Sequence, residues 1–458
     1  MSANGHTDIA GLIKLGEQAV DQAIKGGATV AEAFVRQSAH LSTKVRMREP
    51  ELVEEAGSKS LGMRVMRGQQ VAVTYTSDLT PAGLARFVED ALELARLSQP
   101  DPFAGPPDPS LLSKGAEPDL DLFDPDMSRL DAAEALRRGT AGEIAAFEYD
   151  PRITNSEGAT FTRAAGGVAL VTSGGFRGGH EGTYASVVVS PVVEDEGGKK
   201  RSGYHWAARR HLAALESEVE VGREAARRTL AKLGAQKLPT QEVAVIFDPD
   251  AARSMLGLVA SAVNGGSIWR KSSYLVDREN TRVASDLVTI VDDPFIPRGP
   301  GSRPHDGEGL LSRKNLVVDN GVLRTYLLDS YSARKLGRQS TASASRGSSG
   351  GVGPSTSNFV LQPGGMTADE LLRSTDKALY VTDMMGFGFN AVTGDFSRGA
   401  SGFWVERGEK KFPVSEVTIS LNLDLLLQRI DAVANDLDLR TSIASPTFRV
   451  SAMTLAGK

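Results

Sequence analysis

A short stretch near the middle of the chain, residues 234–240, separates two parts with different sequence patterns. It contains Gly234 and Pro239, and both residue types interrupt regular elements. Helical and β-like patterns alternate before this stretch, whereas short β-like runs separated by turns predominate after it. We therefore predict an α+β protein with two domains. Residues 1–240 are expected to form an N-terminal α/β domain of helices on a β-sheet, and residues 241–458 a C-terminal β-rich, barrel-like domain with a few helices.

The clearest element of the first domain is a helix that begins after Thr80. This threonine is a good N-cap, and Pro81 suits the first turn. Apolar residues follow at helical spacing, namely Leu84, Phe87, Val88, Ala91 and Ala95. Upstream, Arg67-Gly68 fits the turn of a β-hairpin. Further expected elements are helices over residues 9–24, 128–147 and 216–233, strands over 30–36 and 41–48, and several strands within 153–206. The proline-rich residues 98–126 are expected to form a long connection, a kind of segment that is often functional or mobile.

The second domain opens with a strand over residues 242–247 and a helix signalled by Asp248-Pro249-Asp250. Apolar residues at helical spacing follow this signal, namely Met255, Leu256, Val259 and Val263. We expect Gly265-Gly266 to end the helix. The remaining expected elements are strands over residues 283–291, 315–328, 358–361, 379–383, 403–407 and 417–422, and a helix over 423–434.

The composition argues against several classes of protein. The formal net charge is −5 and no run of Lys and Arg stands out, so we expect no nucleic-acid partner. The chain has no cysteine, which excludes disulfides, thiolate zinc sites and cysteine nucleophiles. It also lacks an apolar run of about 18 residues and a signal-like start. We therefore expect a cytoplasmic protein without membrane contact.

Short motifs are spread along nearly the whole chain. Two lie in the first half, Gly62-Met63-Arg64-Val65 and Thr76-Ser77-Asp78-Leu79. Those of the second half occupy residues 267–273, 292–294, 306–309, 329–337, 393–404 and 435–437. Each motif alone is weak. In this order and over this length, they resemble the motifs of the TldD/PmbA family of peptidases and DNA gyrase modulators, and within it those of the PmbA/TldE-type members.

The resemblance implies a division of labour between two kinds of chain. TldD-type members carry a zinc-binding His-Glu-x-x-x-His motif on a helix, and PmbA/TldE-type members lack it and pair with a TldD-type partner. Here Gly257, Leu258 and Ala262 stand roughly where the His, Glu and His would fall, and no histidine lies between His211 and His305. We therefore expect no catalytic residue, metal or cofactor in this chain, with zinc carried by the TldD-type partner.

The histidines lead to the same expectation independently of the family resemblance. A catalytic zinc site normally needs three protein ligands, and the six histidines form no metal-binding pair on a helix. His180-Glu181 begins like a zincin motif, but no histidine follows at residue 184 or 185. His305, beside Asp306 and Glu308, is the best remaining cluster. A turn of solvated polar residues is the commoner outcome for such a cluster.

Other catalytic patterns are weaker. No serine sits in a Gly-x-Ser-x-Gly elbow, and the serine-rich residues 340–349 are more simply a mobile loop. The glycine-rich residues 347–353 lack the Gly-Lys-Ser/Thr of a phosphate-binding loop, so a flexible loop is favoured, one that we expect to become ordered on peptide or partner binding. Residues 393–399 form either a tight turn that satisfies its own backbone or a wall of a cleft in which Asp395 or Arg398 contacts a peptide.

These observations favour a non-metallic subunit of a TldD/TldE-type metallopeptidase complex that degrades or processes small or unfolded peptides. The chain would complete a cleft that admits extended peptides, for example by pairing with a strand edge. Candidate substrate-binding residues are Asn264, Ser267, Arg270, Asp306, Glu308, Asp395, Ser397 and Arg398. One alternative is a binding or regulatory homodimer without a peptidase partner. Another is a stand-alone enzyme with a metal at His305, Asp306 and Glu308.

Overall fold

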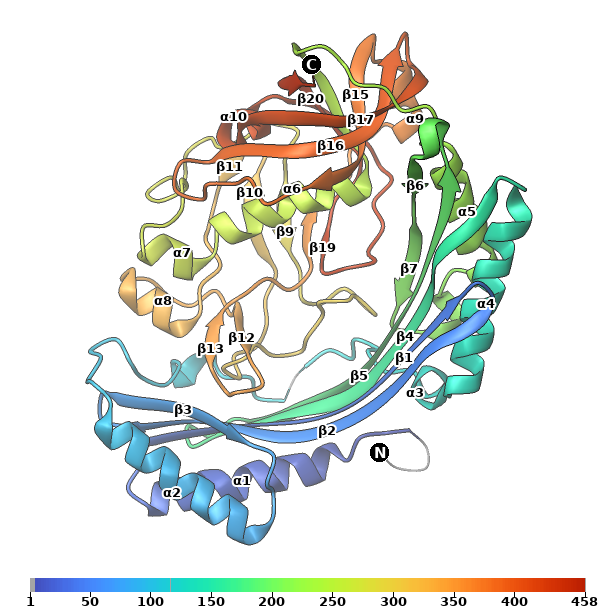
Figure 1. Cartoon of the computed structure of the whole chain (residues 1–458). Helices are drawn as coiled ribbons and strands as arrows, with labels where there is room; N and C mark the ends of the chain where they lie inside the picture. Colours follow the sequence, from blue (N-terminus) through green and yellow to red (C-terminus); the bar gives the residue numbers. More distant parts are fainter. Residues whose placement is uncertain (1–4, 116, 458) are drawn as a thin grey trace.

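The computed structural model describes residues 5–115 and 117–457, and its largest feature is a curved antiparallel sheet of seven strands (Figure 1). The strand order is β3-β2-β1-β4-β5-β6, with β7 also paired to β5. The strands are β1 (Val30–Arg46), β2 (Glu49–Arg67), β3 (Gln70–Thr76), β4 (Ile153–Thr172), β5 (Arg177–Glu194), β6 (Lys200–Ser202) and β7 (His205–Arg209). Strand β1 pairs along most of its length with both β2 and β4, so the sheet is continuous from end to end.

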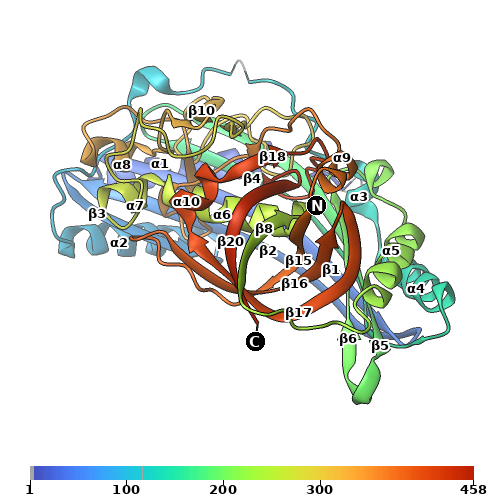
Figure 2. The same cartoon turned by 90° about the horizontal axis from the view of Figure 1, so that it is seen from above.

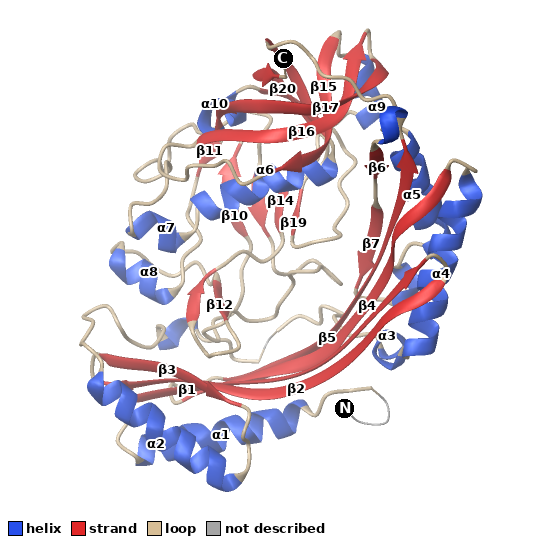
Figure 3. Cartoon of the chain, viewed as in Figure 1, coloured by secondary structure: helices blue, strands red, loops and turns tan. Residues whose placement is uncertain are grey.

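Helices cover the convex face of this sheet at its two ends (Figures 1 and 3). The helices at one end are α1 (Ile9–Lys25) and α2 (Pro81–Leu97), and those at the other are α3 (Pro125–Arg129), α4 (Ala132–Tyr149) and α5 (Glu218–Leu230). The predicted cap is confirmed, since Thr80 Oγ1 accepts a hydrogen bond from Gly83 N at 3.1 Å. All five predicted apolar residues of α2 are buried. In β5, the buried Ala185, Val187 and Val189 alternate with half-buried neighbours, as a strand with one covered face requires.

The concave side of the sheet holds the second half of the chain, which contains a closed five-stranded barrel. Its strands are β8 (Gln241–Phe247), β15 (Lys377–Met385), β16 (Asp395–Glu406), β17 (Glu409–Asn422) and β20 (Phe448–Ala456). They pair in the order β8-β15-β16-β17-β20, and β20 closes the ring by pairing with β8. Figure 2 shows this ring from above. The predicted α+β class with a barrel-like C-terminal region is confirmed.

A second sheet and several short elements complete the C-terminal half. The sheet consists of β9 (Ile290–Asp292), β10 (Asn315–Asp319), β11 (Val322–Leu323), β14 (Phe359–Leu361) and β19 (Ile443–Ala444). Strands β12 (Ala344–Arg346) and β13 (Val352–Pro354) form a hairpin, and β18 (Ile430–Val433) pairs with β20. The helices are α6 (Pro249–Ala262), α7 (Gly265–Trp269), α8 (Ser330–Lys335), α9 (Ala368–Arg373) and α10 (Leu423–Gln428). Short 3-10 turns occupy Pro109–Leu111, Glu196–Gly198 and Leu212–Ala214. No helix in the described ranges is long and apolar enough to cross a membrane.

The proline-rich connection between α2 and α3 is held against the C-terminal half. The guanidinium of Arg334, in α8, donates hydrogen bonds to the backbone carbonyls of Phe103, Gly105 and Pro106, the first at 2.6 Å. The hydroxyl of Tyr331 bonds to Asp101 at 2.7 Å. The bonds of Arg334 satisfy backbone carbonyls of the connection, and all four bonds fasten the two halves together.

Several elements differ from the sequence-based expectations. Residues 30–36 and 41–48 were predicted as two strands, but residues 30–46 form one strand, since residues 37–40 still pair on both sides, and Met47 and Arg48 form the turn to β2. Gly265 opens α7 and does not end α6, because the Asn264 side chain caps the new helix. Only the end of residues 283–291 is a strand. Ser340, Thr341 and Ser343 were predicted in a mobile loop, but they are buried and hydrogen-bonded around the Leu328 carbonyl.

Candidate functional site

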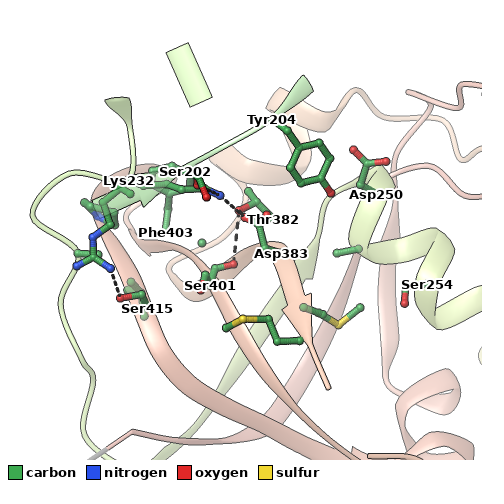
Figure 4. Close-up of a pocket in the computed structure, with 18 of the residues that line it drawn as sticks. Ser202, Tyr204, Lys232, Asp250, Ser254, Thr382, Asp383, Ser401, Phe403 and Ser415 are labelled. Atoms are coloured by element: carbon green, nitrogen blue, oxygen red, sulfur yellow. Dashed lines mark hydrogen bonds and ion pairs between the residues drawn. The ribbon is translucent and has the colours of Figure 1, made fainter. Parts of the chain in front are cut away.

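A groove with a volume of about 530 Å³ lies between the barrel and the arm of the protein formed by α5 and the β6–β7 connection (Figure 4). Its walls come from distant parts of the sequence. The lining residues labelled in Figure 4 are Ser202, Tyr204, Lys232, Asp250, Ser254, Thr382, Asp383, Ser401, Phe403 and Ser415. Interfaces between separately packed units are a common place for binding sites, so this groove is the leading candidate.

Helix α6 forms one wall because its sequence leaves one face uncovered. Asp248 caps the helix by accepting a hydrogen bond from Ala251 N at 2.9 Å. Its apolar residues Ala252, Met255, Leu256 and Val259 recur at helical spacing and are buried in the core. The opposite face carries Ser254, Gly257 and Ser261, one turn apart. A Cβ atom placed on Gly257 would meet nothing within 4 Å, so this face borders open space.

Strand β15 forms the facing wall and offers a backbone edge. Strand β8 ends at Phe247, which pairs with Val381 of β15. Residues 382–385 continue β15 beyond that point. Among the strands of the described ranges, residues 383–385 pair with β16 only, and Thr382 lies at a bulge. These same four residues line the groove. A strand edge therefore lies beside the first turns of α6.

Charged side chains cross the groove between its walls. Lys232 Nζ, at the end of α5, lies 3.2 Å from a carboxylate oxygen of Asp383. The Thr382 hydroxyl bonds to the same carboxylate at 2.7 Å, and Figure 4 shows both contacts. Burial raises the pKa of Tyr204 to about 12, and nearby carboxylates act in the same direction. The groove is thus polar and partly shielded from water, which strengthens electrostatic contacts with a ligand.

The predicted residues Asn264, Ser267 and Arg270 lie along α7, beyond the far end of α6. Asn264 Oδ1 accepts from Gly266 N at 2.9 Å, and its Nδ2 donates to the Pro354 carbonyl at 2.7 Å. Arg270 is exposed, and its guanidinium stacks 5.1 Å from the centre of the Trp269 ring. Asn264 therefore has a structural role, whereas Arg270 is accessible.

Asp306 and Glu308 are buried at the centre of the molecule, between the large sheet and the C-terminal half. Asp306 accepts hydrogen bonds from the backbone nitrogens of Glu308, Leu310 and Ala344, and burial raises its pKa. Glu308 accepts from Ser330 N at 2.9 Å, and burial raises its pKa to about 7. The expected turn of solvated residues is therefore wrong, because both carboxyl groups organise the backbone of a buried loop.

His305 lies in the same buried region, where its ring centre is 5.6 Å from that of His180. Burial lowers the pKa of both rings, that of His180 to about 3. Within residues 5–115 and 117–457, no group of three His, Cys, Asp or Glu side chains is arranged to hold a metal ion.

Asp395, Ser397 and Arg398 open strand β16. The Asp395 carboxylate accepts from the Thr393 hydroxyl at 2.7 Å and from Asn422 at 3.1 Å, as in the tight-turn interpretation. Ser397 is exposed. Arg398 Nη1 donates to the Ser254 hydroxyl at 3.1 Å, so it reaches the open face of α6. Of the eight predicted residues, Arg398 is thus the one in contact with a residue that lines the groove.

Sequence reasoning missed most of the groove. Tyr204, Lys232, Asp383 and Phe403 belong to four separate elements and carry no recognisable spacing. In the sequence, Asp248 is recognisable only as a residue at the start of helix α6. No signal in the sequence could have brought these residues together, because strand pairing and helix packing across the two halves create the groove.

Comparisons with known proteins cover nearly the whole chain. Family models of PmbA/TldA metallopeptidases match residues 31–95 (domain 1), 125–233 (central domain) and 240–457 (C-terminal domain). The metalloprotease PmbA of Escherichia coli O157:H7 is 36% identical over 448 residues, covering 97% of each chain. A PmbA homologue from Haemophilus influenzae is 38% identical over 444 residues, covering 96% of this chain and 94% of the relative.

Two solved structures resemble the fold. A protein described as a modulator of DNA gyrase, from Bacteroides thetaiotaomicron, superposes with a TM-score of 0.91 at 28% identity, covering 99% of this chain and 100% of the other. TldE from Thermococcus kodakarensis shares the fold with a TM-score of 0.85 at 22% identity, covering 97% of this chain and 100% of the other.

Proposed function

The chain belongs to the PmbA/TldD metallopeptidase family, and from this premise we propose that it is a TldE-type subunit of a peptidase complex. A TldD-type chain would be its partner and would carry the zinc. The complex would degrade or process small or unfolded peptides. This chain would bind the peptide in an extended form and help to complete the cleft.

The chemistry of helix α6 supports a role without zinc. The resemblance places the zinc ligands of TldD-type chains on this helix, and the matching residues here are Gly257, Leu258 and Ala262. None of the three offers an imidazole or a carboxylate, the groups that would have to complete such a site in a chain without cysteine. A zinc ion therefore does not fit this helix. We assign no catalytic step to a metal in this chain.

The strand edge of β15 within the groove is the main support for this proposal. No strand in the part of the chain that the structure describes pairs with one edge of residues 382–385, and the uncovered face of α6 lies beside them. An extended peptide that pairs with such an edge is held mainly through its backbone. Backbone pairing tolerates many sequences, which suits a subunit that presents varied unfolded peptides.

Peptide hydrolysis by the separate and mixed subunits tests the proposal. We expect cleavage only in samples that contain the TldD-type partner, strongest in the mixture, and no stoichiometric zinc in this chain. A chain that binds stoichiometric metal and cleaves peptides by itself would refute the proposal. A chain that forms homodimers and leaves the activity of the partner unchanged would favour a regulatory role.

A pair of variants tests peptide binding along α6. Gly257→Trp would project a large side chain into the open space beside α6, one turn beyond Ser254, which lines the groove, so we expect it to reduce cleavage by the mixture at least about tenfold. Gly365→Trp is the matched control, because a Cβ atom at Gly365 also meets nothing within 4 Å and this residue precedes α9, outside both the groove and α6. Equal activity of the two variants would argue against peptide binding along α6.

A further inference from the structure

A smaller and more enclosed pocket of about 200 Å³ opens from the groove. The two spaces share five lining residues, Tyr204, Lys232, Thr382, Asp383 and Phe403. Thr382 and Asp383 belong to the strand edge of β15. A peptide paired with that edge would therefore reach the pocket without a change of direction.

Four cationic side chains line this pocket, against two carboxyl groups. The cations are Arg227, Arg228, Lys232 and Lys410, and the carboxyl groups are those of Asp248 and Asp383. Lys232 pairs with Asp383 at 3.2 Å. Arg227 and Arg228 share one carboxylate outside the lining, that of Glu224, at 2.7 and 2.8 Å. Arg228 also lies 3.8 Å from the carboxylate of Asp250, which itself pairs with Arg253. Three guanidiniums on two carboxylates leave one positive charge in excess.

Lys410 supplies a second uncompensated charge. Its ammonium lies 3.4 Å from the centre of the Tyr380 ring and 5.5 Å from that of Phe403. No Asp or Glu of the described ranges lies within 4.0 Å of it in an ion pair. Lys410 as a whole is exposed, but partial loss of water around its ammonium lowers the pKa to about 8, so the side chain still carries its charge at neutral pH. Such a cation gains most from an anion that enters the pocket.

Asp248 only partly offsets these cations. Burial raises its pKa to about 7 although its carboxylate also caps α6, so the group is incompletely ionised at neutral pH. The pocket thus combines aromatic walls, excess positive charge and a partly protonated acid. That combination disfavours the binding of a cationic ligand and favours the binding of a small anion.

We propose that this pocket binds a carboxylate of the peptide held on β15, either the free C-terminus or an acidic side chain near that end. The cations Lys410, Arg227 and Arg228 would face the carboxylate, and the rings of Tyr380 and Phe403 would pack against its stem. This inference rests on the proposed role of the groove in peptide binding. It adds a preference for acidic or C-terminal segments that backbone pairing alone cannot provide.

Binding of labelled extended pentapeptides to the full chain tests the proposal. Three peptides are compared, one with a free C-terminus, one amidated, and one amidated with a Glu at the last position. We expect the free acid to bind about tenfold more tightly than the plain amide, because charge-assisted hydrogen bonds are among the stronger polar contacts. If the Glu peptide also binds tightly, the pocket accepts side chains. If it does not, the pocket is specific for the terminus.

Two lysine variants locate the effect. The Lys410→Met variant should bind the free-acid peptide and the amidated peptide with the same affinity, namely the weaker affinity that the unchanged chain shows for the amide. Lys411→Met is the matched control, because Lys411 is the next residue and pairs with Glu409, away from the pocket. This control should keep the tenfold preference. The comparison of peptides on the unchanged chain stands even if Lys410→Met folds poorly.

Equal binding of all three peptides, or no saturable binding up to about 10 mM, would overturn the carboxylate site. So would an equal loss in the two lysine variants. These outcomes remain separate from the proposed subunit function. If the mixture with the TldD-type partner cleaves peptides while acid and amide bind alike, the subunit role stands and the carboxylate pocket is wrong.

Discussion

Two regions of the molecule gather charged groups but treat them in opposite ways. At the junction between the large sheet and the β12–β13 hairpin, the buried Glu32 carboxylate lies 2.6 Å from the Arg346 guanidinium and 3.2 Å from that of Arg64. In the pocket beside α5, the exposed Lys410 forms no ion pair with a carboxylate of residues 5–115 and 117–457. Paired charges that join two halves fix their arrangement, whereas a charge that faces empty space is available to a ligand.

Glycines show the same contrast. In the junction, a Cβ atom on Gly62 would lie 2.4 Å from the backbone nitrogen of Gly350, so the sheet and the hairpin touch through their backbones. On α6, a Cβ atom on Gly257 would meet nothing within 4 Å. The first glycine permits a close contact, and the second leaves a space.

The strongest test removes the charge of Glu32. Burial by itself raises its pKa, but Arg64 and Arg346 more than offset this, and the net pKa is lowered. Glu32→Gln leaves both guanidiniums without their carboxylate, so we expect the free energy of unfolding to fall by about 3 to 5 kcal/mol. Urea denaturation at neutral pH measures this loss.

Glu409→Gln is the control for that loss, since Glu409 forms an exposed pair with Lys411. It should leave the free energy of unfolding unchanged within error. A Glu32→Gln variant as stable as this control would show that the junction does not depend on its charges.

The pH dependence of Asp248 provides the second test. Its folded-state pKa is raised from 3.8 to about 7, so the folded protein binds this proton more tightly than the unfolded chain. The protonated Asp248 carboxyl therefore stabilises the folded protein relative to the unfolded chain below about pH 4, and this stabilisation is lost as the pH rises toward 7. The Asp248→Asn variant keeps a capping oxygen and serves as the reference. Over that pH range, the free energy of unfolding of the wild type should fall by about 2 to 4 kcal/mol relative to that of the variant.

Urea denaturation of both proteins at several pH values measures this difference. Above about pH 7, the difference in the free energy of unfolding between the two proteins should remain constant. A difference that does not change with pH would mean that the folded-state pKa of Asp248 is not raised, and the pocket would then contain a full negative charge at neutral pH.

The third test concerns the backbone contact in the junction. Gly62→Ala must push apart the sheet and the hairpin, which we expect to cost about 1 to 3 kcal/mol of stability. Gly353→Ala, in the same hairpin, should cost less, because a Cβ atom there meets nothing within 4 Å. Thermal denaturation compares the two. Equal midpoints would imply that the hairpin moves away from the sheet without cost.

The smallest effect should have the opposite sign. Gly257→Ala adds a helix-favouring residue at a helical position with open surroundings, so we expect a gain of about 0.5 to 1 kcal/mol. The same thermal measurement applies, and cleavage by the mixed subunits should be nearly unchanged because a methyl group leaves the groove open. A loss of stability would mean that another part of the protein packs against this face.

Local elements could be predicted when their signals lie within a few residues. Helix α2 has the predicted cap and buried face, and α6 begins where Asp248 and Pro249 indicated. Predictions were wrong where distant partners decide the outcome. Residues 37–40 stay in strand β1 because β2 and β4 pair with them on both sides. Gly265 continues into a helix because Asn264 caps it while bonding to Pro354, ninety positions away.

Short stretches of sequence were enough to define the capped helices, the change of pattern near residue 240, the family motifs and the residue types on the open face of α6. These depend on neighbours in the chain or on the residues themselves. The tertiary structure alone decided that Asp306 and Glu308 are buried, and that Tyr204, Lys232, Asp383 and Lys410 surround one pocket. Such contacts arise from strand pairing and packing between segments up to about two hundred residues apart, and pairing of this kind leaves no periodic signal in the sequence.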